Sequence, residues 1–332
     1  MKKQLSLVFV GLLIFLSCQK PATNPTKNTE EVSAAPINGA PGLQRCATYE
    51  VLQQQLIENP SLKSRMDEIE KFTQQFMNNP QAYKLIAPDT YEIPVVFNVL
   101  YKTSAQNVSD AQLASQIDVL NEDFGATNSD YNNTPPLFQP IRSGNINVQF
   151  KLVTTVRKPT NKTQWSTNNA MKKSSQGGID PTDPTHKLNI WVCNMGGGIL
   201  GYAQFPGGNS ATDGVVLDDE ATGRTGTAKP PYGLGRTATH EVGHWLNLRH
   251  IWGDATCGND QVGDTPLHNT ANYGCPVYPH LSTCTGTPVE MTMNYMDYTY
   301  DACMYMFTAG QKTRMHATFG SGGGRTSFAG SL

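Results

Sequence analysis

The sequence predicts an α+β fold in which a main domain of strands and helices is followed by a region rich in loops. Short apolar runs with many β-branched residues alternate with helical patterns between residues 93 and 218. A histidine-rich stretch, HEVGHWLNLRH, follows at residues 240–250. After about residue 253 the chain is rich in Gly, Pro, Asn and Cys, which favour loops. The length of 332 residues suits one main core with a smaller accessory segment.

The first 18 residues have the features of an export signal. Two lysines precede the apolar run 5–16, which is shorter than the roughly 20 residues that a membrane-spanning helix needs. The run ends in FLSC, which resembles a bacterial lipobox with Cys18 as the lipidated residue; an ordinary cleaved signal is the alternative. Residues 19–44 have almost no large apolar side chains and are expected to form a flexible tether. We therefore expect an exported protein, either a cell-envelope lipoprotein or a secreted one.

The charge of the chain argues against one class of partner. Lys+Arg 25 against Asp+Glu 27 leaves a net charge of -2, and no long run of one sign is present. Nucleic-acid binding needs a basic patch, so we do not expect it. The expected partners are protein or peptide substrates. We expect a monomer that meets a membrane only through an N-terminal lipid anchor.

Two amphipathic helices are predicted between residues 46 and 79, with a break at Pro60. Their apolar positions recur at helical spacing: Leu52, Leu56, Ile57, Met66, Ile69, Phe72 and Phe76. Helices this short do not form a core alone, so we expect them to pack on another part of the chain.

The main domain is predicted to open with a strand at residues 93–101, IPVVFNVLY, which is rich in β-branched and aromatic residues. A helix is expected at residues 109–124, capped by Ser109 or Asp110. Further strands are expected between turns rich in Gly, Pro and Asn, at residues 146–156, 187–193, 200–205 and 214–218. A last helix is expected near residues 308–318.

The stretch HEVGHWLNLRH combines metal-ligand and acid–base residues at helical spacing. His240 and His244 are four residues apart, so a helix presents both imidazoles on one face, where they can share one zinc ion. Glu241 follows the first histidine directly and can act as a general base beside the metal. A helix with two surface histidines is the plain alternative, and the third histidine, His250, weighs against it.

His250 lies six residues after His244, and a straight helix would rotate it away from the metal-facing side. The helix must therefore end between them, at a residue with positive φ. Glycine usually takes this conformation, and asparagine is among the few other residues that adopt it readily. We expect Asn247 to end the helix and to let Leu248 and Arg249 bring His250 back to the metal.

The pattern HExxHxxGxxH followed by a methionine turn is that of the metzincin zinc peptidases, and this sequence resembles it with Asn247 in place of the glycine. The string MNYMDYTYDACMYMFTAGQKTRM resembles the pappalysin, or cytophagalysin, family M43 of metzincins, as do NIWVCNMGGGILGYAQFPGG and TDGVVLDDEATG upstream. The resemblance covers most of residues 91–319. It implies a metzincin-like catalytic domain, with a mixed twisted sheet and an active-site helix above a loop-rich C-terminal subdomain.

Carried over position by position, the resemblance implies that the three histidines bind zinc and that Met296 forms an apolar floor beneath them. Core packing alone is the alternative for Met296. Tyr298 would lie near the metal and stabilise the oxyanion, although its phenol could equally be a satisfied core group. A water at the fourth zinc position would attack the peptide carbonyl while Glu241 takes its proton.

The stretch Leu200, Gly201, Tyr202 and Ala203 is expected to be an edge strand that holds an extended substrate by backbone pairing, as in metzincins; an ordinary sheet strand fits the sequence equally well. Asp301 matches a family position in the pocket for the residue after the scissile bond. A carboxylate there would favour arginine or lysine.

Four cysteines, Cys257, Cys275, Cys284 and Cys303, lie in the loop-rich part, where an exported domain benefits most from disulfides. Four cysteines allow three pairings, and their spacing does not choose among them. The resemblance implies Cys257 with Cys284 and Cys275 with Cys303. Cys193, in the apolar stretch LNIWVCN, is expected to be a buried free thiol.

Asp254, Asp260 and Asp264 lie in GDATCGNDQVGDTP, a polar loop dense in oxygen ligands. Spacing alone favours a solvated acidic loop, because no EF-hand pattern is present. The family resemblance favours a Ca²⁺ site formed by these three aspartates instead.

Cys46 precedes the two accessory helices, and a thiolate is a strong fourth ligand for zinc. Pappalysin-like zymogens have a cysteine in a similar context. The resemblance therefore implies that residues 19–88 are a tether and propeptide, whose removal releases an active domain at residues 89–332. An unpaired or intermolecular cysteine is the alternative.

Together these expectations describe an exported Zn²⁺-dependent endopeptidase that is made as a cysteine-latched zymogen. The alternative is a zinc-stabilised surface binding lipoprotein without turnover, which would arise if Asn247 held His250 away from the metal. Glu241 argues against it, because a purely structural zinc site uses four protein ligands and needs no adjacent base.

Overall fold

The computed structural model describes residues 45–80 and 90–330, which lie within one compact unit. The export signal predicted at residues 1–18 and the tether at residues 19–44 lie outside the described residues. None of the helices in the described ranges is long and apolar enough to cross a membrane. In chain order the helices and longer strands are α1 (Thr48–Glu58), α2 (Ser61–Asn78), β1 (Tyr91–Tyr101), α3 (Asp110–Gly125), β2 (Val148–Pro159), β3 (Leu188–Cys193), β4 (Gly201–Ala203), β5 (Val215–Asp218), α4 (Arg236–Trp245) and α5 (Ala309–Ala317).

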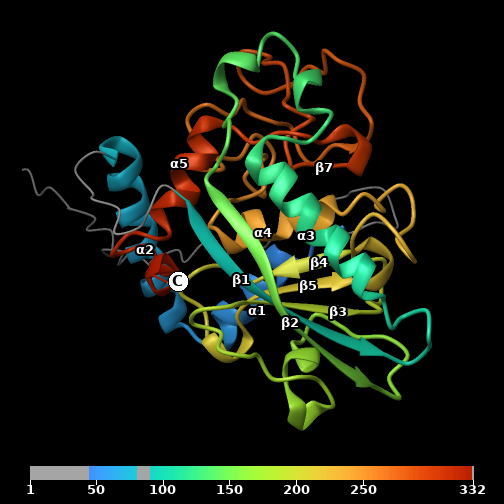
Figure 1. Cartoon of the computed structure of the whole chain (residues 1–332). Helices are drawn as coiled ribbons and strands as arrows, with labels where there is room; N and C mark the ends of the chain where they lie inside the picture. Colours follow the sequence, from blue (N-terminus) through green and yellow to red (C-terminus); the bar gives the residue numbers. More distant parts are fainter. Residues whose placement is uncertain (1–44, 81–89, 331–332) are drawn as a thin grey trace, which may run out of the picture. The chain divides into compact units, whose positions relative to one another are not determined.

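A five-stranded mixed sheet forms the centre, with strand order β2-β1-β3-β5-β4 (Figure 1). Neighbouring strands pair in parallel except β4, which pairs antiparallel with β5 and forms an edge. Every residue of β3 is buried, as is typical of a central parallel strand covered on both faces. The predicted mixed sheet is confirmed. Strand β4 ends at Ala203, before the predicted end at residue 205. Ala203 pairs with Val215, which is the first residue of β5, so no partner strand continues beyond it.

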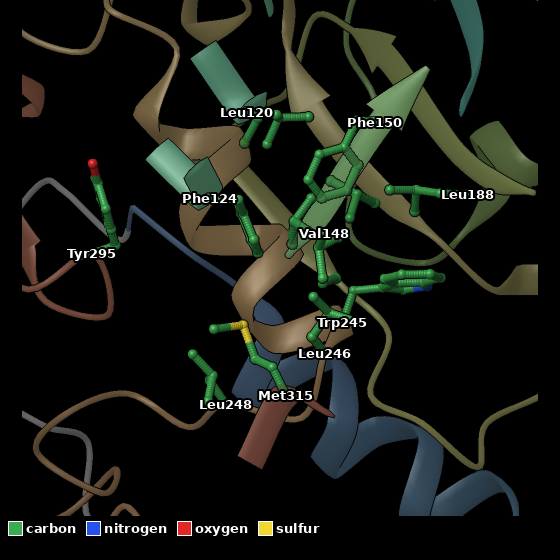
Figure 2. Packing of buried hydrophobic residues seen from close by; sticks show 14 of the residues in the cluster. Leu120, Phe124, Val148, Phe150, Leu188, Trp245, Leu246, Leu248, Tyr295 and Met315 are labelled. Atoms are coloured by element: carbon green, nitrogen blue, oxygen red, sulfur yellow. The ribbon is translucent and has the colours of Figure 1, made fainter. Parts of the chain in front are cut away.

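Helices α3 and α4 pack on the sheet and on each other (Figure 1). The Ser109 hydroxyl caps α3 by accepting a hydrogen bond from the Gln112 amide at 3.1 Å, as predicted. Leu120 and Phe124 on the buried face of α3 belong to one cluster with Phe150 of β2 (Figure 2). Burying each such side chain contributes about 1.5–3 kcal/mol, so this face holds α3 in place.

The accessory helices pack on the rest of the chain, as their apolar faces predicted. Helix α2 lies against α5, and α1 contacts the edge strand β4. Helix α5 begins with a capping box, in which Thr308 and Gln311 satisfy each other's backbone amides. The buried side chains of α2 are Leu62, Ile69, Thr73 and Phe76.

The chain beyond α4 is largely loop, with two short strands, β6 (Tyr273–Gly274) and β7 (Tyr298–Thr299), that pair in parallel and were not predicted. Disulfides join Cys257 to Cys284 and Cys275 to Cys303, the two pairs that the resemblance implied. Cys193 is buried and free, as expected, and Cys46 is also buried and free.

Candidate metal centre

Helix α4 carries the first two histidines and is buried along its whole length. A Cβ at Gly243 would come within 2.5 Å of the Met296 sulfur, so glycine lets the methionine pack directly against the helix between His240 and His244. Met296 is fully buried there, and its carbonyl accepts a hydrogen bond from the Ile251 amide at 3.1 Å. The methionine thus lies against the same helix turn that carries the histidines.

Helix α4 ends in a Schellman motif at Asn247, whose φ is 71°. The Leu248 amide donates to the Gly243 carbonyl, and the Asn247 amide donates to the His244 carbonyl, both at 2.9 Å. This turn ends the helix and redirects the chain toward His250. The Asn247 side chain is itself buried, and its amide donates to the Thr73 hydroxyl of α2 at 3.3 Å.

The three histidines converge through their Nε2 atoms. The Nε2 of His244 lies 3.1 Å from the Nε2 of His240 and 3.1 Å from the Nε2 of His250. On the other side of the rings, the Nδ1 atoms of His240 and His244 face backbone carbonyl oxygens at 2.7 and 2.8 Å, and the Nδ1 of His250 faces the Asp254 carboxylate at 2.5 Å. The tautomer with its proton on Nδ1 satisfies each of these acceptors and leaves a bare lone pair at Nε2.

Three bare lone pairs this close repel one another, so the arrangement calls for a cation. Nitrogen ligands at 2.0–2.1 Å from a tetrahedral zinc ion are about 3.3 Å apart, close to the separations found here. Burial and the neighbouring rings lower the pKa of His240 well below its usual value and lower the pKa of His244 to about 3. Both rings are therefore neutral at physiological pH, and the donor set fits zinc.

Cys46 completes this cluster. Its thiol and the three imidazoles offer ligand atoms that all lie within 4.8 Å of one another, and all four residues are buried. Within residues 45–80 and 90–330 this is the only group of three or more His, Cys, Asp or Glu side chains placed to hold a metal. Burial and the nearby Glu241 carboxylate raise the pKa of the Cys46 thiol, and a metal bound at this sulfur would displace its proton.

Glu241 lies between the histidines and the segment that contains Cys46. Its Oε2 accepts a hydrogen bond from the Thr48 hydroxyl at 2.9 Å and from the Cys46 thiol at 3.4 Å. Its Oε1 is buried without a hydrogen-bond partner. Burial raises the pKa of Glu241 to about 7. A buried carboxylate oxygen without a partner is costly, which marks this point as a place for a water or a substrate group.

Residues 45–47, directly before α1, lie along the edge strand β4, with a parallel β-bridge between Cys46 and Gly201. The Leu200 amide donates to the Arg45 carbonyl at 2.9 Å, and the Ala47 amide donates to the Gly201 carbonyl at 3.1 Å. The Ala203 amide donates to the Thr48 hydroxyl at 2.8 Å. The strand predicted to pair with substrate therefore offers its backbone groups to an extended segment of the same chain.

Two tyrosines of the predicted site lie in different surroundings. The Tyr298 hydroxyl donates to the Cys46 carbonyl at 3.1 Å, and its ring packs edge-on against that of His250. Tyr202 is fully buried, and its hydroxyl donates to the Asn169 side chain at 3.0 Å. The side chain of Tyr202 therefore belongs to the core, and only its backbone lies along the edge of β4.

Asp301 is fully buried and holds a basic side chain. The Nη2 of Arg45 lies 3.5 Å from the Asp301 Oδ1. The guanidinium stacks over the Tyr232 ring, 4.0 Å from its centroid, and its Nη1 donates to the Thr299 carbonyl. A carboxylate, an aromatic face and a carbonyl oxygen thus form a pocket for a planar cation next to the metal cluster.

The structure does not bring together the three aspartates that the resemblance implied as calcium ligands. Asp254 faces His250, Asp260 accepts a hydrogen bond from a threonine hydroxyl of its own loop at 2.9 Å, and Asp264 accepts one from Thr308 at 2.6 Å. Each carboxylate is engaged by a different partner. Calcium binding at this loop stays a prediction without a shared ligand cluster, and Asp254 belongs to the histidine site.

Sequence reasoning missed Arg45, Thr48, Tyr232 and Trp252. Trp252 stacks on the His250 ring at 4.3 Å, with 7° between the planes. Arg45 could have been noticed, because a basic residue directly precedes the candidate zinc thiolate and the pocket is predicted to prefer basic residues. The other three residues lie outside any recognisable motif, and only the fold brings them to the site.

Residues 183–320 match the peptidase M43 family model, described as Pregnancy-associated plasma protein-A. An extracellular metalloprotease of Colletotrichum graminicola is 31% identical over 302 residues, which are 87% of this chain and 94% of that protein. A Tannerella forsythia promirolysin mutant matches in structure with a TM-score of 0.77 at 42% identity, over 86% of this chain and 97% of that one. Mature mirolysin of the same organism, in complex with a cleaved peptide, matches with a TM-score of 0.69 at 48% identity, over 72% of this chain and 95% of that one.

Proposed function

The chain belongs to the peptidase M43 family of zinc metalloproteases, and from that premise we propose that it is an exported endopeptidase made as a cysteine-latched zymogen. In this proposal Glu241 is the general base, and arginine or lysine is preferred after the scissile bond. One observation carries it. Three buried imidazole nitrogens, the Cys46 thiol and the Glu241 carboxylate converge beside the edge strand β4.

The roles of the catalytic residues follow from their atoms. The Nε2 atoms of the three histidines would hold a zinc ion, which when bound would polarise the substrate carbonyl and lower the pKa of water towards 7. The Glu241 carboxylate, bare at Oε1, takes the proton of the attacking water and passes it to the leaving amine. The Tyr298 hydroxyl, which donates here to the Cys46 carbonyl, donates to the carbonyl oxygen of a bound substrate and stabilises its negative charge.

The contacts of residues 45–48 with the metal cluster, Glu241 and the pocket at Asp301 support latency. Cys46 would supply the fourth metal ligand, the Thr48 hydroxyl donates to Oε2 of Glu241, and Arg45 fills the pocket at Asp301. The cavity that remains beside Glu241 measures about 10 Å³, room for no more than about one water molecule. A substrate therefore enters only after this segment leaves.

The boundary of the propeptide is part of the proposal. The match to promirolysin covers 86% of this chain, whereas the match to mature mirolysin covers 72%. This difference supports a removable N-terminal part, with residues 19–88 as tether and propeptide and residues 89–332 as the catalytic domain. Relatives described as extracellular metalloproteases support export, and lipid anchoring at Cys18, a monomeric state and calcium binding remain predictions.

The preference for a basic residue is supported by Arg45, which the pocket binds in this structure. A substrate arginine or lysine would meet the same Asp301 carboxylate. The alternative of a zinc-stabilised binding protein without turnover loses its premise, because the turn at Asn247 does bring His250 to the other two histidines.

The proposal is tested with purified protein whose N-terminal segment has been cleaved by an added protease that is then removed, together with a peptide library and a chelator. We expect about one zinc per chain. Cleavage should occur before arginine or lysine and stop when the chelator removes the metal. Glu241→Gln should keep the zinc and lower kcat by about 10²–10⁴-fold, the usual contribution of a general base. Undiminished cleavage by Glu241→Gln, or a protein that binds no zinc, would overturn the proposal.

A further inference from the structure

His250 differs from the other two histidines in what directs its ring. His240 and His244 lie on α4, so the helix sets the direction of both side chains, and their Nδ1 atoms face neutral backbone carbonyls. His250 follows the turn at Asn247 and lies on a loop. No helix directs its ring, so contacts of the ring itself must do so.

Besides the other two histidines, three side chains lie around the His250 ring. The Asp254 Oδ1 lies 2.5 Å from Nδ1, and the Trp252 indole stacks face to face on the ring at 4.3 Å. Tyr298 meets the ring edge-on, with centroids 5.0 Å apart. With both its face and its Nδ1 taken, the ring presents Nε2 to His244, 3.1 Å away.

The backbone after Trp252 adopts an uncommon conformation that turns Asp254 back to His250. Gly253 and Asp254 both have positive φ, 64° and 56°. A Cβ at Gly253 would come within 2.3 Å of the Asn259 nitrogen, so glycine is required there. Aspartate is one of the few residues with a Cβ that adopt the left-handed conformation, so it can follow Gly253 in this turn.

We propose that Asp254 is a positioning residue for the metal and that it acts through His250, with Trp252 as the platform for the ring. This inference rests on the proposed zinc site. The carboxylate accepts the Nδ1 proton, fixes the tautomer that leaves Nε2 bare, and increases the electron density that Nε2 donates to the ion. For His240 and His244, backbone carbonyls accept the Nδ1 proton and fix the tautomer. Because a carbonyl carries no full charge, it increases the electron density at Nε2 less than a carboxylate does.

Other contacts already fix this loop, which argues against a purely structural role for Asp254. The loop is already fixed by a hydrogen bond from the Gly253 amide to the His250 carbonyl at 2.8 Å and by the disulfide of Cys257. Asp254 also has only 16% of its side chain exposed, so its contact with His250 is not a solvent-screened surface pair.

The test compares zinc affinities of the full-length chain by competition with a chelating dye. Asp254→Asn keeps the size of the side chain and removes its charge, and we expect zinc to bind about 10–100-fold more weakly. The matched control is Asp264→Asn, a loop aspartate of the same region that bonds to Thr308, with an expected change within about 2-fold. The zinc affinity of Trp252→Phe should be closer to that of the wild type than the affinity of Trp252→Leu, because phenylalanine keeps an aromatic ring under His250.

A spectroscopic readout separates positioning from folding. We expect the visible spectrum of the Co²⁺-loaded chain to change in Asp254→Asn and to stay the same in Asp264→Asn. Wild-type zinc affinity in Asp254→Asn would overturn the inference, and so would an equal loss in both variants, which would indicate a loosened loop. None of these measurements needs turnover, so a failure of the proposed peptidase activity would be seen separately.

Discussion

At the scale of single residues, the metal centre depends on one backbone angle. Asn247, at φ 71°, stands where the motif of the metzincins has glycine, and the turn that it closes brings His250 within 3.1 Å of His244. Asparagine tolerates this conformation better than other residues with a Cβ, which explains how the departure from glycine is accommodated.

Substitutions at Asn247 test this directly. Asn247→Gly should change the free energy of unfolding by no more than about 1 kcal/mol, since glycine adopts the angle freely and only the hydrogen bond to Thr73 is lost. Asn247→Val should cost about 2 kcal/mol or more, because a β-branched residue fits the left-handed region poorly. Thermal unfolding and zinc affinity of the full chain measure both. Similar values for the two variants would contradict this account of the turn.

Tyr232 should make the pocket at Asp301 bind a substrate arginine more favourably than a substrate lysine. A planar guanidinium stacks on the ring as Arg45 does, whereas an ammonium group gains less from the ring face. Tyr232→Leu should lower kcat/KM for peptides with arginine after the scissile bond by about 3–30-fold and change lysine peptides less. Tyr232→Phe, which keeps the ring, is the control. An unchanged arginine-to-lysine ratio in the leucine variant would rule out this role.

Spacing alone predicted the residues whose geometry is local. His240, Glu241 and His244 lie on one helix, and the need for a turn before His250 follows from helix rotation. For Asp254 the resemblance implied calcium binding, and its contact with His250 was not predicted. That contact depends on two consecutive residues with positive φ, which sequence composition does not reveal.

At the scale of elements, helix α2 docks on the turn at Asn247, which precedes the third histidine. The buried Arg314 of α5 donates from Nε to the Asn247 carbonyl at 2.7 Å. Its Nη1 and Nη2 donate to the Glu70 carboxylate of α2 at 2.9 and 2.5 Å. Together with the contact between Thr73 and Asn247, this ties α2 to the metal centre at a point remote from Cys46.

The docking of α2 should weaken in acid as the Glu70 carboxylate becomes protonated. Burial alone would raise the pKa of Glu70, but Arg314 outweighs it and lowers the pKa from its ordinary 4.5 to about 2. A depressed pKa contributes stability above about pH 4.5 that is lost as the pH falls towards 2, at most about 3 kcal/mol. Glu70→Gln should therefore lower the hydrogen-exchange protection of residues 61–78 at pH 7, and its difference from wild type should shrink at pH 3.

The matched control for Glu70→Gln is Glu68→Gln, a substitution of the same type at an exposed position of α2. It should change the protection of the helix by no more than about 0.5 kcal/mol at either pH. Equal effects of the two substitutions would mean that α2 is held by its apolar face alone.

Elements were more predictable than their contacts. The starts of α3 and α5 follow from side-chain caps at Ser109 and Thr308. Helices α1 and α2 have no side-chain cap, and they follow from apolar periodicity and the break at Pro60. The docking of α2 joins residues that are 244 positions apart, and neither Glu70 nor Arg314 has a sequence pattern that identifies the other. The resemblance to the family supplied the two disulfide pairs, which spacing left open.

At the scale of the whole molecule, the segment before the sheet holds the catalytic domain at two places. Residues 45–48 pair with β4 and occupy the metal cluster, and α2 packs against α5 and the turn at Asn247. The sequence order of propeptide, sheet, zinc helix and loop-rich region could be predicted. That both contacts of this segment lie beside the proposed zinc ligands could not be predicted, because it depends on the closure of the fold.

The two buried free cysteines allow a matched test of latency in the intact chain. A structural zinc site with four ligands contributes about 10–16 kcal/mol, or about 3 kcal/mol per ligand, so removing the thiol should weaken the closed state by on the order of 100-fold. Cys46→Ala should therefore raise the rate of peptide cleavage before any processing and speed conversion to the mature form. Cys193→Ala removes a thiol that is equally buried but lies on β3, outside the metal cluster, and should leave latency unchanged. Activity is measured on chains that mass spectrometry shows to be uncleaved. If both variants stay as latent as wild type, α2 and Arg45 hold the segment without help from the thiol, and the cysteine latch fails as an explanation.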